Sequence, residues 1–519
     1  MQKHKTWFEK YHHIIAVFLI IIVSLPIYLQ SINTPFFYDD IGRIKRNLDY
    51  MHTLPLGEAF VYPIPSRPLF NLVIYVFSLL NVKSPIYFHI FSISIHILNS
   101  VLLYVLLNRF KNLFDKTTTL YISLLFLIHP LSGESVHYIH SFSVLLSTFF
   151  ILVTAIFFSD YFLKADFIRY NRLGLSFVSA FLAYISKETS IILPLLLILV
   201  LVCLLKRRLE WKHFPIFAIY FLESSIIIFL LVLEGNAHKD TAGFSLGSPF
   251  AFLFTQLHYS SFATSLFFLP FNQSIYHDLT MQDYHLSFGF IPGMLFIIIF
   301  ITSIFQSRTN PLVNFSILWM GISILPTNTL YPILDIITEY RLYLALIGFC
   351  TLFGYSISRL NFSKSIKYTI VITIFLYFYI FSFGRALLWR DTSSLWMDAL
   401  EKYPRSTRIL NNLGTSYMGK GKFDRAKHFL ELSLKNNPYQ FSSYHNLGII
   451  LYNENNYQEA IQRFLTVTKI NPEYPYSYYY LGLCYEKLGD EMMKEKYLQK
   501  ARKLSFNLLA EPPLIVEKP

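Results

Sequence analysis

Long apolar runs separated by short polar segments fill the first 390 residues of the chain. Eleven runs are long enough, or paired well enough with a neighbour, to cross a bilayer as helices. They lie at about 14–30, 86–107, 119–130, 139–163, 173–186, 190–205, 213–233, 288–305, 312–326, 342–360 and 367–388. The pattern therefore predicts an all-α membrane domain over residues 1–390.

Another apolar stretch, Pro68 to Leu80, is only 13 residues long and is followed by Asn81, Lys83 and Pro85. That length suits a helix lying in the membrane interface better than a crossing. With this stretch on the outer surface, five loops on the opposite side are all basic, as cytoplasmic loops should be. These loops are 108–118, 164–172, 206–212, 306–311 and 361–367. The N-terminus is then cytoplasmic, and the outer segments are 31–85, 129–138, 187–189, 234–287 and 327–341.

From about Asp391 the apolar runs stop, and the composition predicts a separate water-soluble domain over residues 391–510. Residues recur there at a spacing of 34: Pro404, Pro438 and Pro472; Gly414, Gly448 and Gly482; Tyr417, Leu451 and Tyr485. Ala426 and Ala460 provide the small side chain that close packing of paired helices needs, whereas Lys494 stands there in the third unit. This pattern resembles about three tetratricopeptide repeats, whose stacked helix pairs form an α-solenoid that binds proteins. Eleven crossings place the repeats outside, where they present a protein substrate or only scaffold an assembly.

The composition agrees with a membrane protein, because 54% of the 519 residues are hydrophobic and only 15% are charged. The net charge of +12 comes mostly from the short loops, so it indicates orientation and not a nucleic-acid partner. Cys203 and Cys350 fall in apolar runs and Cys484 stands alone, which predicts neither a disulfide framework nor a cysteine metal site.

Asp39 and Asp40 are the leading candidates for catalysis, because they lie about ten residues beyond the first apolar run. Adjacent carboxylates at a membrane rim can act as a general base on a hydroxyl or as metal ligands. The alternative is a turn in which they cap the following helix, since aspartate favours such positions. The spacing alone leaves both interpretations open.

Several motifs occur in a fixed order along the chain, and all of them except Asn108-Arg109, at the end of the second predicted span, lie on the predicted outer side. After the Asp pair come Ser66-Arg67-Pro68-Leu69, Asn108-Arg109, His129-Pro130 with Glu134, Ser186-Lys187-Glu188, Glu339-Tyr340-Arg341-Leu342-Tyr343-Leu344, and Leu395-Trp396 before the repeats. This order resembles the C-type (GT-C) glycosyltransferases that use polyprenyl-phosphate sugars. It resembles most the O-mannosyltransferase-like membrane proteins with C-terminal tetratricopeptide repeats.

The resemblance implies an inverting sugar transfer that is metal-independent or loosely metal-assisted. One of Asp39 and Asp40 would take the proton of the acceptor hydroxyl. The expected donor-phosphate ligands are Arg67, Lys187 and Arg341, although Arg341 is also suited to an ion pair with Glu339 or to a helix-end anchor. The expected substrate pocket comprises His129, Glu134, His137, Glu188 and Glu339. No resident cofactor or metal is expected, the alternative being a divalent metal on Glu134, His137 and His140, which are spaced by three residues.

The sequence thus predicts a membrane glycosyltransferase that moves mannose or a related hexose from a polyprenyl-phosphate donor to a hydroxyl of an exported protein. One alternative keeps the chemistry with a lipid or polysaccharide acceptor, because the interfacial helix also resembles transferases that modify lipid A. Another is a non-catalytic scaffold, which would tolerate loss of both aspartates. The Ile-, Phe-, Lys-, Asn- and Tyr-rich composition favours a bacterial inner membrane with periplasmic repeats over an endoplasmic reticulum with luminal repeats.

Overall fold

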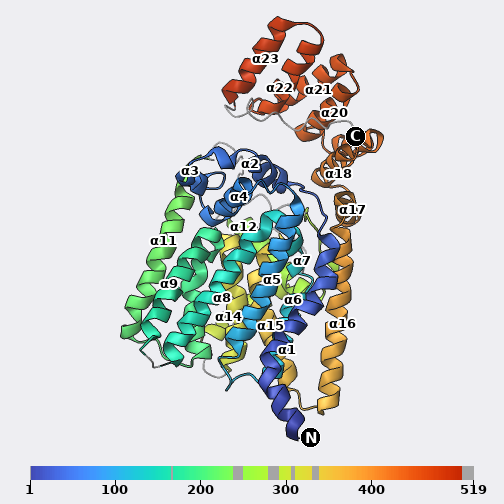
Figure 1. Cartoon of the computed structure of the whole chain (residues 1–519). Coiled ribbons are helices and arrows are strands. Elements are labelled where there is room, and N and C mark those ends of the chain that lie inside the picture. The colour runs from blue at the N-terminus through green and yellow to red at the C-terminus, as the bar shows by residue number, and fades with distance from the viewer. Residues whose placement is uncertain are drawn as a thin grey trace. The chain divides into compact units, whose positions relative to one another are not determined.

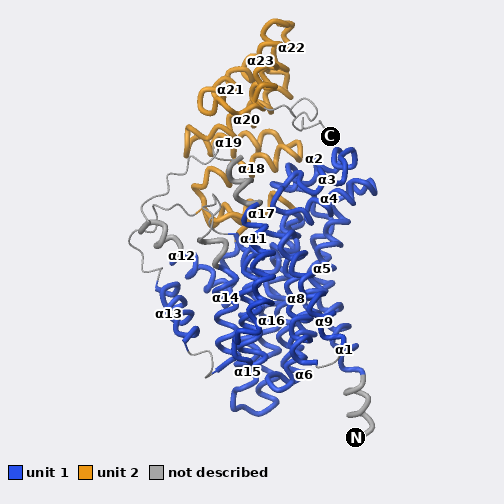
Figure 2. The backbone as a smooth tube through the Cα atoms, turned by 90° about the vertical axis from the view of Figure 1, so that its left-hand side faces the viewer, with its two compact units in different colours: residues 1–273, 279–390 blue, residues 274–278, 391–519 orange. Residues whose placement is uncertain are grey.

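A computed structural model describes residues 2–164, 167–237, 249–278, 291–305, 310–329 and 338–504, and these residues form helices, turns and loops without any strand. The chain divides into two compact units, shown in blue and orange in Figure 2. Unit 1 comprises residues 1–273 and 279–390, and unit 2 comprises residues 274–278 and 391–519. The expected outer segments 234–287 and 327–341 and the expected repeat domain 391–510 lie partly outside the described residues.

Unit 1 is a bundle of long helices that run side by side in Figure 1. A helix is found at every one of the eleven predicted apolar runs. These helices are α1 (Gln2–Tyr28), α5 (Pro85–Leu107), α6 (Lys116–Ile128), α8 (Phe142–Leu163), α9 (Arg169–Ser186), α10 (Leu193–Leu199) with η6 (Val200–Leu204), α11 (Phe214–Ala237), α13 (Ile291–Phe305), α14 (Pro311–Thr329), α15 (Tyr343–Arg359) and α16 (Lys364–Leu388). Helix α8 packs against α5 and α9, and α14 packs against α15.

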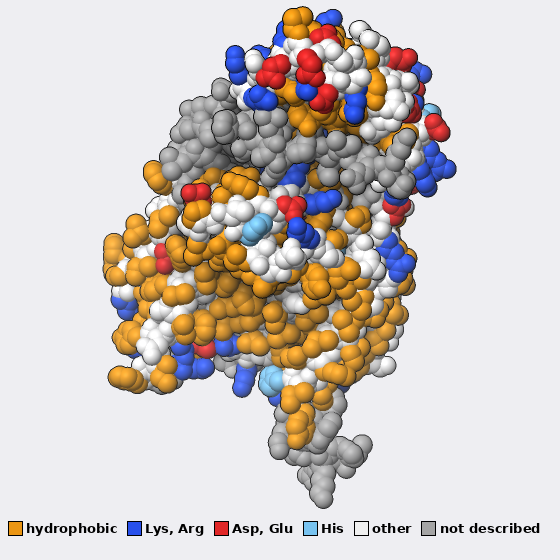
Figure 3. Space-filling model, turned by 45° about the horizontal axis from the view of Figure 1, so that its top comes forward, with side chains coloured by type: hydrophobic (Ala, Val, Ile, Leu, Met, Phe, Trp, Pro, Cys, Tyr) orange, Lys and Arg blue, Asp and Glu red, His pale blue; other side chains and the backbone are white. Residues whose placement is uncertain are grey.

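The outer surface of this bundle is suited to lipid. Six described helices, namely α1, α5, α8, α11, α15 and α16, are long and apolar enough to cross a membrane. Large apolar side chains such as Phe18, Leu222 and Ile380 are exposed on them, although burial would be expected in water. Figure 3 shows hydrophobic side chains covering the side of the bundle, with charged ones mainly towards its ends. The chain is therefore an integral membrane protein, but the predicted number of eleven crossings is not established because the remaining apolar helices are shorter or less apolar.

Helix α12 (Pro249–Phe268) was not expected, since the sequence predicted that residues 234–287 form an outer segment between two crossings. Polar residues including Gln256, His258 and Ser261 interrupt its apolar sequence and lower its hydropathy. The helix is nevertheless part of unit 1 and packs against α13. At this contact the backbone N–H of Gly293 donates to Ser261 Oγ at 2.6 Å, and a Cβ at Gly293 would lie 2.1 Å from the Leu257 carbonyl oxygen.

The first outer segment folds into short helices that cover one end of the bundle in Figure 1. They are η1 (Leu29–Ser31), η2 (Ile41–Lys45), α2 (Arg46–Leu48), η3 (Met51–Thr53), α3 (Leu56–Val61) and α4 (Pro68–Leu79). Helix α4 begins at Pro68, where a missing N–H costs nothing because the first turn has no intrahelical partner for it. It buries Phe70 and Ile74 and exposes Val76 and Leu79, as an amphipathic helix does.

Unit 2 contains the repeat helices, and it includes α17 (Thr392–Lys402) and residues 274–278. Three helix pairs follow α17: α18 (Thr407–Gly419) with α19 (Phe423–Asn436), α20 (Phe441–Asn453) with α21 (Tyr457–Ile470), and α22 (Pro475–Lys487) with α23 (Glu491–Leu504). The short segment 274–278 joins this unit through a 3.0 Å hydrogen bond between His277 Nδ1 and the Tyr403 hydroxyl, and through Arg408 over the Tyr276 ring.

The 34-residue period has a packing cause in each helix pair. Ala426 and Ala460 are fully buried, as predicted. The recurring glycine of the first helix also lies against a large side chain of the second: Gly414 against Leu430, Gly448 against Phe464, and Gly482 against Leu498. Since a Cβ on any of these glycines would lie within 2.7 Å of that side chain, the glycine allows the two helices to approach closely.

Substituting Gly448→Leu is therefore expected to destabilise the repeat unit. A Cβ at this position would lie 2.6 Å from the Phe464 ring, so overpacking should cost about 1–3 kcal/mol and lower the unfolding midpoint by about 5 °C or more. Limited proteolysis of the full chain over a temperature series would measure this midpoint. Gly419→Ala is the matched control, because no atom lies within 4 Å of its Cβ position. An unchanged midpoint in Gly448→Leu would contradict the close helix approach.

Candidate active site

Segments from distant parts of unit 1 meet beside the short helices of the first outer segment. They are the loop 34–40, helix α7 (Ser132–His137) with η4 (Ile139–Ser141), the turn η5 (Glu188–Ile192), the turn η11 (Glu339–Leu342) and the start of α4. Helix α7 contacts both η4 and η11. The structure thus brings together most of the predicted outer motifs.

The two adjacent aspartates have different environments. Asp40 is 1% exposed, and its Oδ1 accepts a 2.7 Å hydrogen bond from the backbone N–H of His140. Its Oδ2 accepts a longer bond of 3.4 Å from the N–H of Phe37. Burial raises the pKa of Asp40 well above its ordinary value, despite these two hydrogen bonds. Asp40 therefore connects the loop 34–40 to η4, which is a structural position.

Asp39 is only partly buried, whereas Asp40 is fully buried. Its Oδ2 accepts a 3.1 Å hydrogen bond from the hydroxyl of Tyr138. Burial, and then the charges of Asp39 and Asp40, raise the pKa of Tyr138 well above its ordinary value, so this hydroxyl stays protonated and donates a hydrogen bond to Asp39. Tyr38, just before the pair, has a φ of 53°, a left-handed conformation that is uncommon for a residue with a Cβ.

The predicted phosphate ligands form a group of cations, two of which, Arg67 and Lys187, act on the carboxylate of Glu188. Arg67 Nε and Nη2 donate to the two carboxylate oxygens of Glu188, each at 2.7 Å, which is the bidentate geometry of a strong ion pair. Lys187 is 4% exposed, and its Nζ lies 5.1 Å from the centre of the Tyr340 ring. Arg341 lies over the same ring at 5.9 Å. Lys187 and Arg341 also line a small cavity of about 20 Å³, enough for a water molecule.

The charges in this group shift the pKa values of Lys187 and Glu188, two neighbouring buried residues. Burial lowers the pKa of Lys187 well below its ordinary value, and the neighbouring positive charge of Arg67 adds to that shift, with Arg341 and Arg43 contributing. Burial alone would raise the pKa of Glu188, but the charges of Arg67 and Lys187 outweigh it and hold the pKa below its ordinary value. Glu188 thus stays ionised and partly neutralises the cations, whereas Lys187 lacks a carboxylate of its own among the described contacts.

His140 connects the aspartates with the cations. Its backbone N–H holds Asp40, and its ring lies within electrostatic reach of Arg67, Arg43 and Lys187. The ring also contacts that of Phe70 in helix α4, with the centroids 5.6 Å apart. The carboxylates and the cationic group are therefore parts of one site.

The residues predicted to line a substrate pocket occupy several positions. Glu134 accepts a 2.9 Å hydrogen bond from the N–H of Tyr340, and Glu339 accepts a 2.7 Å bond from Gln273. Burial raises the pKa of Glu134 well above its ordinary value, and the charge of Glu339 adds to this. His137 hydrogen-bonds to Ser31 through Nδ1. His129 donates from Nε2 to the Phe267 carbonyl at 2.9 Å and accepts at Nδ1 from the Leu131 N–H. Both of its ring nitrogens are therefore hydrogen-bonded to backbone groups.

The alternative metal site on Glu134, His137 and His140 is not assembled in the described part of the chain, where no group of three His, Cys, Asp or Glu side chains is close enough to hold a metal ion. Glu134 turns to Tyr340 and His137 to Ser31. Their spacing of three residues does not place them on one helix face, because α7 ends at His137 and η4 follows.

Other residues of this site were missed in the sequence. Tyr138 donates to Asp39, the Tyr340 ring lies under Lys187, and Arg43 adds positive charge. Gln273 donates a hydrogen bond to Glu339, and the positive charge of Arg385 partly offsets the rise in the pKa of Glu134. Tyr340 lies inside a selected motif but had been given no role, Tyr138 follows His137, and Arg43 follows the Asp pair by three residues, so proximity in sequence was the available signal.

Comparisons with known proteins find similarities for the C-terminal repeats and for most of the chain. A family described as "Tetratricopeptide repeat" matches residues 407–440, and one described as "TPR repeat" matches residues 448–489. Protein O-mannosyl-transferase TMTC3 of Homo sapiens is 22% identical over 511 residues, which cover 88% of this chain and 55% of that protein. Protein O-mannosyl-transferase F38B6.6 of Caenorhabditis elegans is 24% identical and covers 76% of this chain and 59% of that protein.

Among solved structures, the archaeal oligosaccharyltransferase AglB from Archaeoglobus fulgidus aligns with 82% of this chain and 60% of its own, at 12% identity and a TM-score of 0.43. The chain spans between about half and three fifths of the length of the two curated relatives. The predicted resemblance is confirmed: over most of its length the chain is similar to the protein O-mannosyl-transferases, and its C-terminal unit is built of tetratricopeptide repeats.

Proposed function

We propose that the chain is a membrane glycosyltransferase that moves mannose or a related hexose from a polyprenyl-phosphate donor to a hydroxyl of a protein. The observation that carries this proposal is a partly exposed aspartate, Asp39, in one site with the cations Arg67, Lys187 and Arg341. The similarity to protein O-mannosyl-transferases supports the reaction class. The donor is a substrate, and the proposed reaction needs no resident cofactor.

Asp39 is the proposed general base. It takes the proton of the acceptor hydroxyl as that oxygen bonds to the anomeric carbon. The bond between this carbon and the phosphate oxygen breaks in the same displacement, so the configuration inverts and the electron pair leaves with the lipid phosphate. Tyr138 orients Asp39 through its hydroxyl, and Asp40 fixes the loop from behind.

The proposed role of the cations is to bind the lipid phosphate and stabilise the charge that grows on it as it leaves. Lys187 and Arg341 are suited to this role because they share a polar cavity. The cavity is too small for a phosphate group, so donor binding has to widen it. Arg67 is held by Glu188 and would act at longer range, which makes it the weaker ligand of the three.

The tetratricopeptide repeats support a protein acceptor, because such solenoids bind peptides and proteins. In this proposal the repeats and Asp39 are on the outer side of the membrane, either in a bacterial periplasm or in the lumen of the endoplasmic reticulum. A lipid or polysaccharide acceptor would use the same base and cations, so the acceptor has to be identified separately from the chemistry.

Incubating membranes that contain the full chain with labelled polyprenyl-phosphate mannose would test this function. We expect label in the protein fraction and expect it to be absent from membranes without the chain. Label in the lipid or polysaccharide fraction would contradict a protein acceptor but would still support a glycosyltransferase. The non-catalytic scaffold would be the better explanation if folded protein transfers no mannose, glucose or galactose while the repeats still capture a partner.

A further inference from the structure

A pocket of unit 1 lies far from the candidate active site. It has a volume of about 330 Å³ and is lined by residues of α6, α15 and α16. Its polar residues lie at the first turn of α6, whereas the candidate active site lies beyond the last turn of that helix. Since α6 has 13 residues, the two places are separated by about 20 Å along its axis. The pocket therefore does not belong to the transfer chemistry.

One end of the pocket is polar and positively charged. Lys364 and Lys367 from α16 and Thr117 from the start of α6 line this end, and Asp115 beside them caps α6 by accepting from the Thr118 N–H at 2.7 Å. Lys367 Nζ donates to the Ser358 carbonyl at 2.8 Å, which leaves two further protons on that ammonium. The described side chains of Lys364 and Thr117 make no hydrogen bond within the chain.

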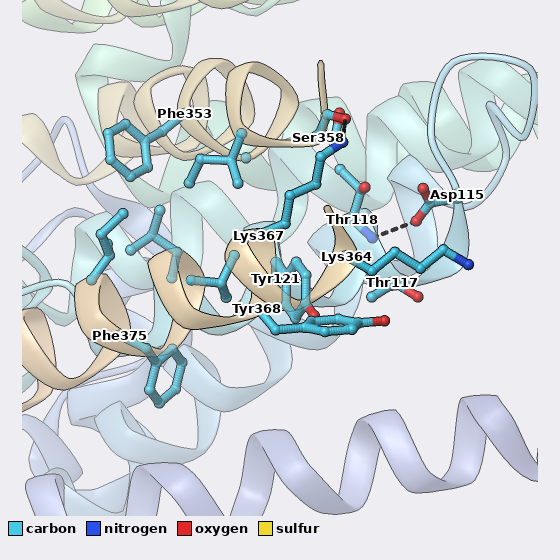
Figure 4. Close-up of a pocket in the computed structure, with 15 residues that line it drawn as sticks. Asp115, Thr117, Thr118, Tyr121, Phe353, Ser358, Lys364, Lys367, Tyr368 and Phe375 are labelled. Carbon is cyan, nitrogen blue, oxygen red and sulfur yellow. Dashed lines mark hydrogen bonds between the residues drawn. The ribbon is translucent and has the colours of Figure 1, made fainter. Parts of the chain in front are cut away.

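The other end of the pocket is apolar. Leu125, Phe353, Val371, Ile374 and Phe375 line it. Figure 4 shows this division: Phe353 and Phe375 lie on one side, and Asp115, Thr117, Thr118, Ser358 and Lys364 on the other. The rings of Tyr121 and Tyr368 lie between the two ends.

We propose that this pocket binds one anionic phospholipid of the surrounding leaflet. The two ammonium groups and the hydroxyls of Thr117 and Tyr368 are donors for the phosphodiester, and the apolar end takes the beginning of an acyl chain. Two lysines and one aspartate give this end a net charge of +1, which matches a headgroup with one negative charge. Both walls, α15 and α16, are helices long and apolar enough to cross a membrane, so the pocket lies where one leaflet meets water.

The site lies between the loops 108–118 and 361–367, which the charge pattern predicts to be cytoplasmic. Basic side chains close to the cytoplasmic surface attract anionic lipids. The bound lipid would hold α6, α15 and α16 together at this end, because its headgroup and chain contact all three. The proposed role is therefore structural stabilisation by a specific lipid.

Titrating the purified full chain in neutral detergent with phosphatidylglycerol tests the proposal, with phosphatidylcholine of the same acyl chains and inorganic phosphate as comparisons. We expect phosphatidylglycerol to raise the unfolding midpoint by several degrees and the other two to change it little. Lys364→Gln with Lys367→Gln should weaken phosphatidylglycerol binding about 25-fold, about fivefold for each lysine. Val371→Phe, which fills the apolar end and keeps both charges, should also weaken it.

The matched control is Lys206→Gln with Arg208→Gln, two basic residues of another predicted cytoplasmic loop, and it should keep the full effect of phosphatidylglycerol. An equal effect of phosphatidylcholine would overturn the requirement for an anionic headgroup. An equal effect of inorganic phosphate would replace the lipid by a small anion. If the control weakens binding as much as the double lysine variant, the lipid recognises overall charge and the pocket is not its site.

Discussion

Asp39→Asn is expected to lower sugar transfer by about 10²–10⁴-fold while the protein stays folded. An amide cannot accept the proton of the acceptor hydroxyl, but it can still accept the hydrogen bond that Tyr138 donates to this position. The side chain is partly exposed, so its substitution removes little packing. The measurement is the rate of label transfer from a polyprenyl-phosphate sugar, together with the thermal midpoint of the purified variant.

Asp40→Asn is the matched control, since it changes the adjacent carboxyl in the same way. Asp40 accepts from the His140 N–H in a buried position, and an asparagine oxygen can accept the same bond, so only the longer bond from the Phe37 N–H is lost. Burial already raises the pKa of Asp40, so a neutral side chain is tolerated there. Transfer should fall by no more than about tenfold. Loss of transfer in Asp40→Asn with full activity in Asp39→Asn would reverse the two roles, and full activity in both would remove the aspartates from the mechanism.

The helices of unit 1 could be predicted because continuous apolar runs are a strong and local signal. Helices such as α5, α8 and α16 lie where those runs lie. Helix α12 was missed because it carries Gln256 and His258 among its apolar residues, which resembles an interfacial segment when hydropathy alone is considered. The repeats could be predicted because each pair repeats the same small-against-large contact, and the sequence must repeat with it.

The candidate site could be predicted only in outline. Placing the charged motifs on one side of the membrane domain was enough to select Asp39, Arg67, Lys187 and Arg341. The different environments of Asp39 and Asp40 depend on residues about 100 positions away, because Tyr138 donates a hydrogen bond to Asp39 and His140 donates one to Asp40. Such contacts leave no local pattern.

The same limit applies to the histidines and to the ion pair. Both nitrogens of His129 are used by backbone groups, one of them the Phe267 carbonyl 138 residues later, which suits a structural residue more than a substrate ligand. The bidentate bond between Arg67 and Glu188 joins residues 121 positions apart. Glu188 was predicted as a pocket residue and Arg67 as a phosphate ligand, and their mutual pairing could not be read from either motif.

Lys187→Met is expected to lower transfer by about 10²–10³-fold, because a positioned charge at the leaving phosphate is lost. The protein should stay folded, since an unpaired buried ammonium costs desolvation free energy that an apolar side chain of similar size does not. Arg67 remains paired with Glu188 in this variant, so no carboxylate is left without a cation. Lys83→Met is the control: Lys83 is an exposed lysine of the first outer segment, and its ion pair with Asp49 is also exposed and contributes little.

The pH dependence of donor binding separates a phosphate ligand from a structural lysine. Burial, reinforced by Arg67, lowers the pKa of Lys187, so its charge is lost at a lower pH than that of an ordinary lysine. A donor phosphate favours the ammonium form, so binding takes up a proton and should weaken as pH rises through that lowered pKa. The KM for the donor should therefore rise with pH in the wild type and be high and nearly flat in Lys187→Met. If the variant keeps the wild-type pH profile, Lys187 does not bind the phosphate, and Arg341 becomes the leading candidate.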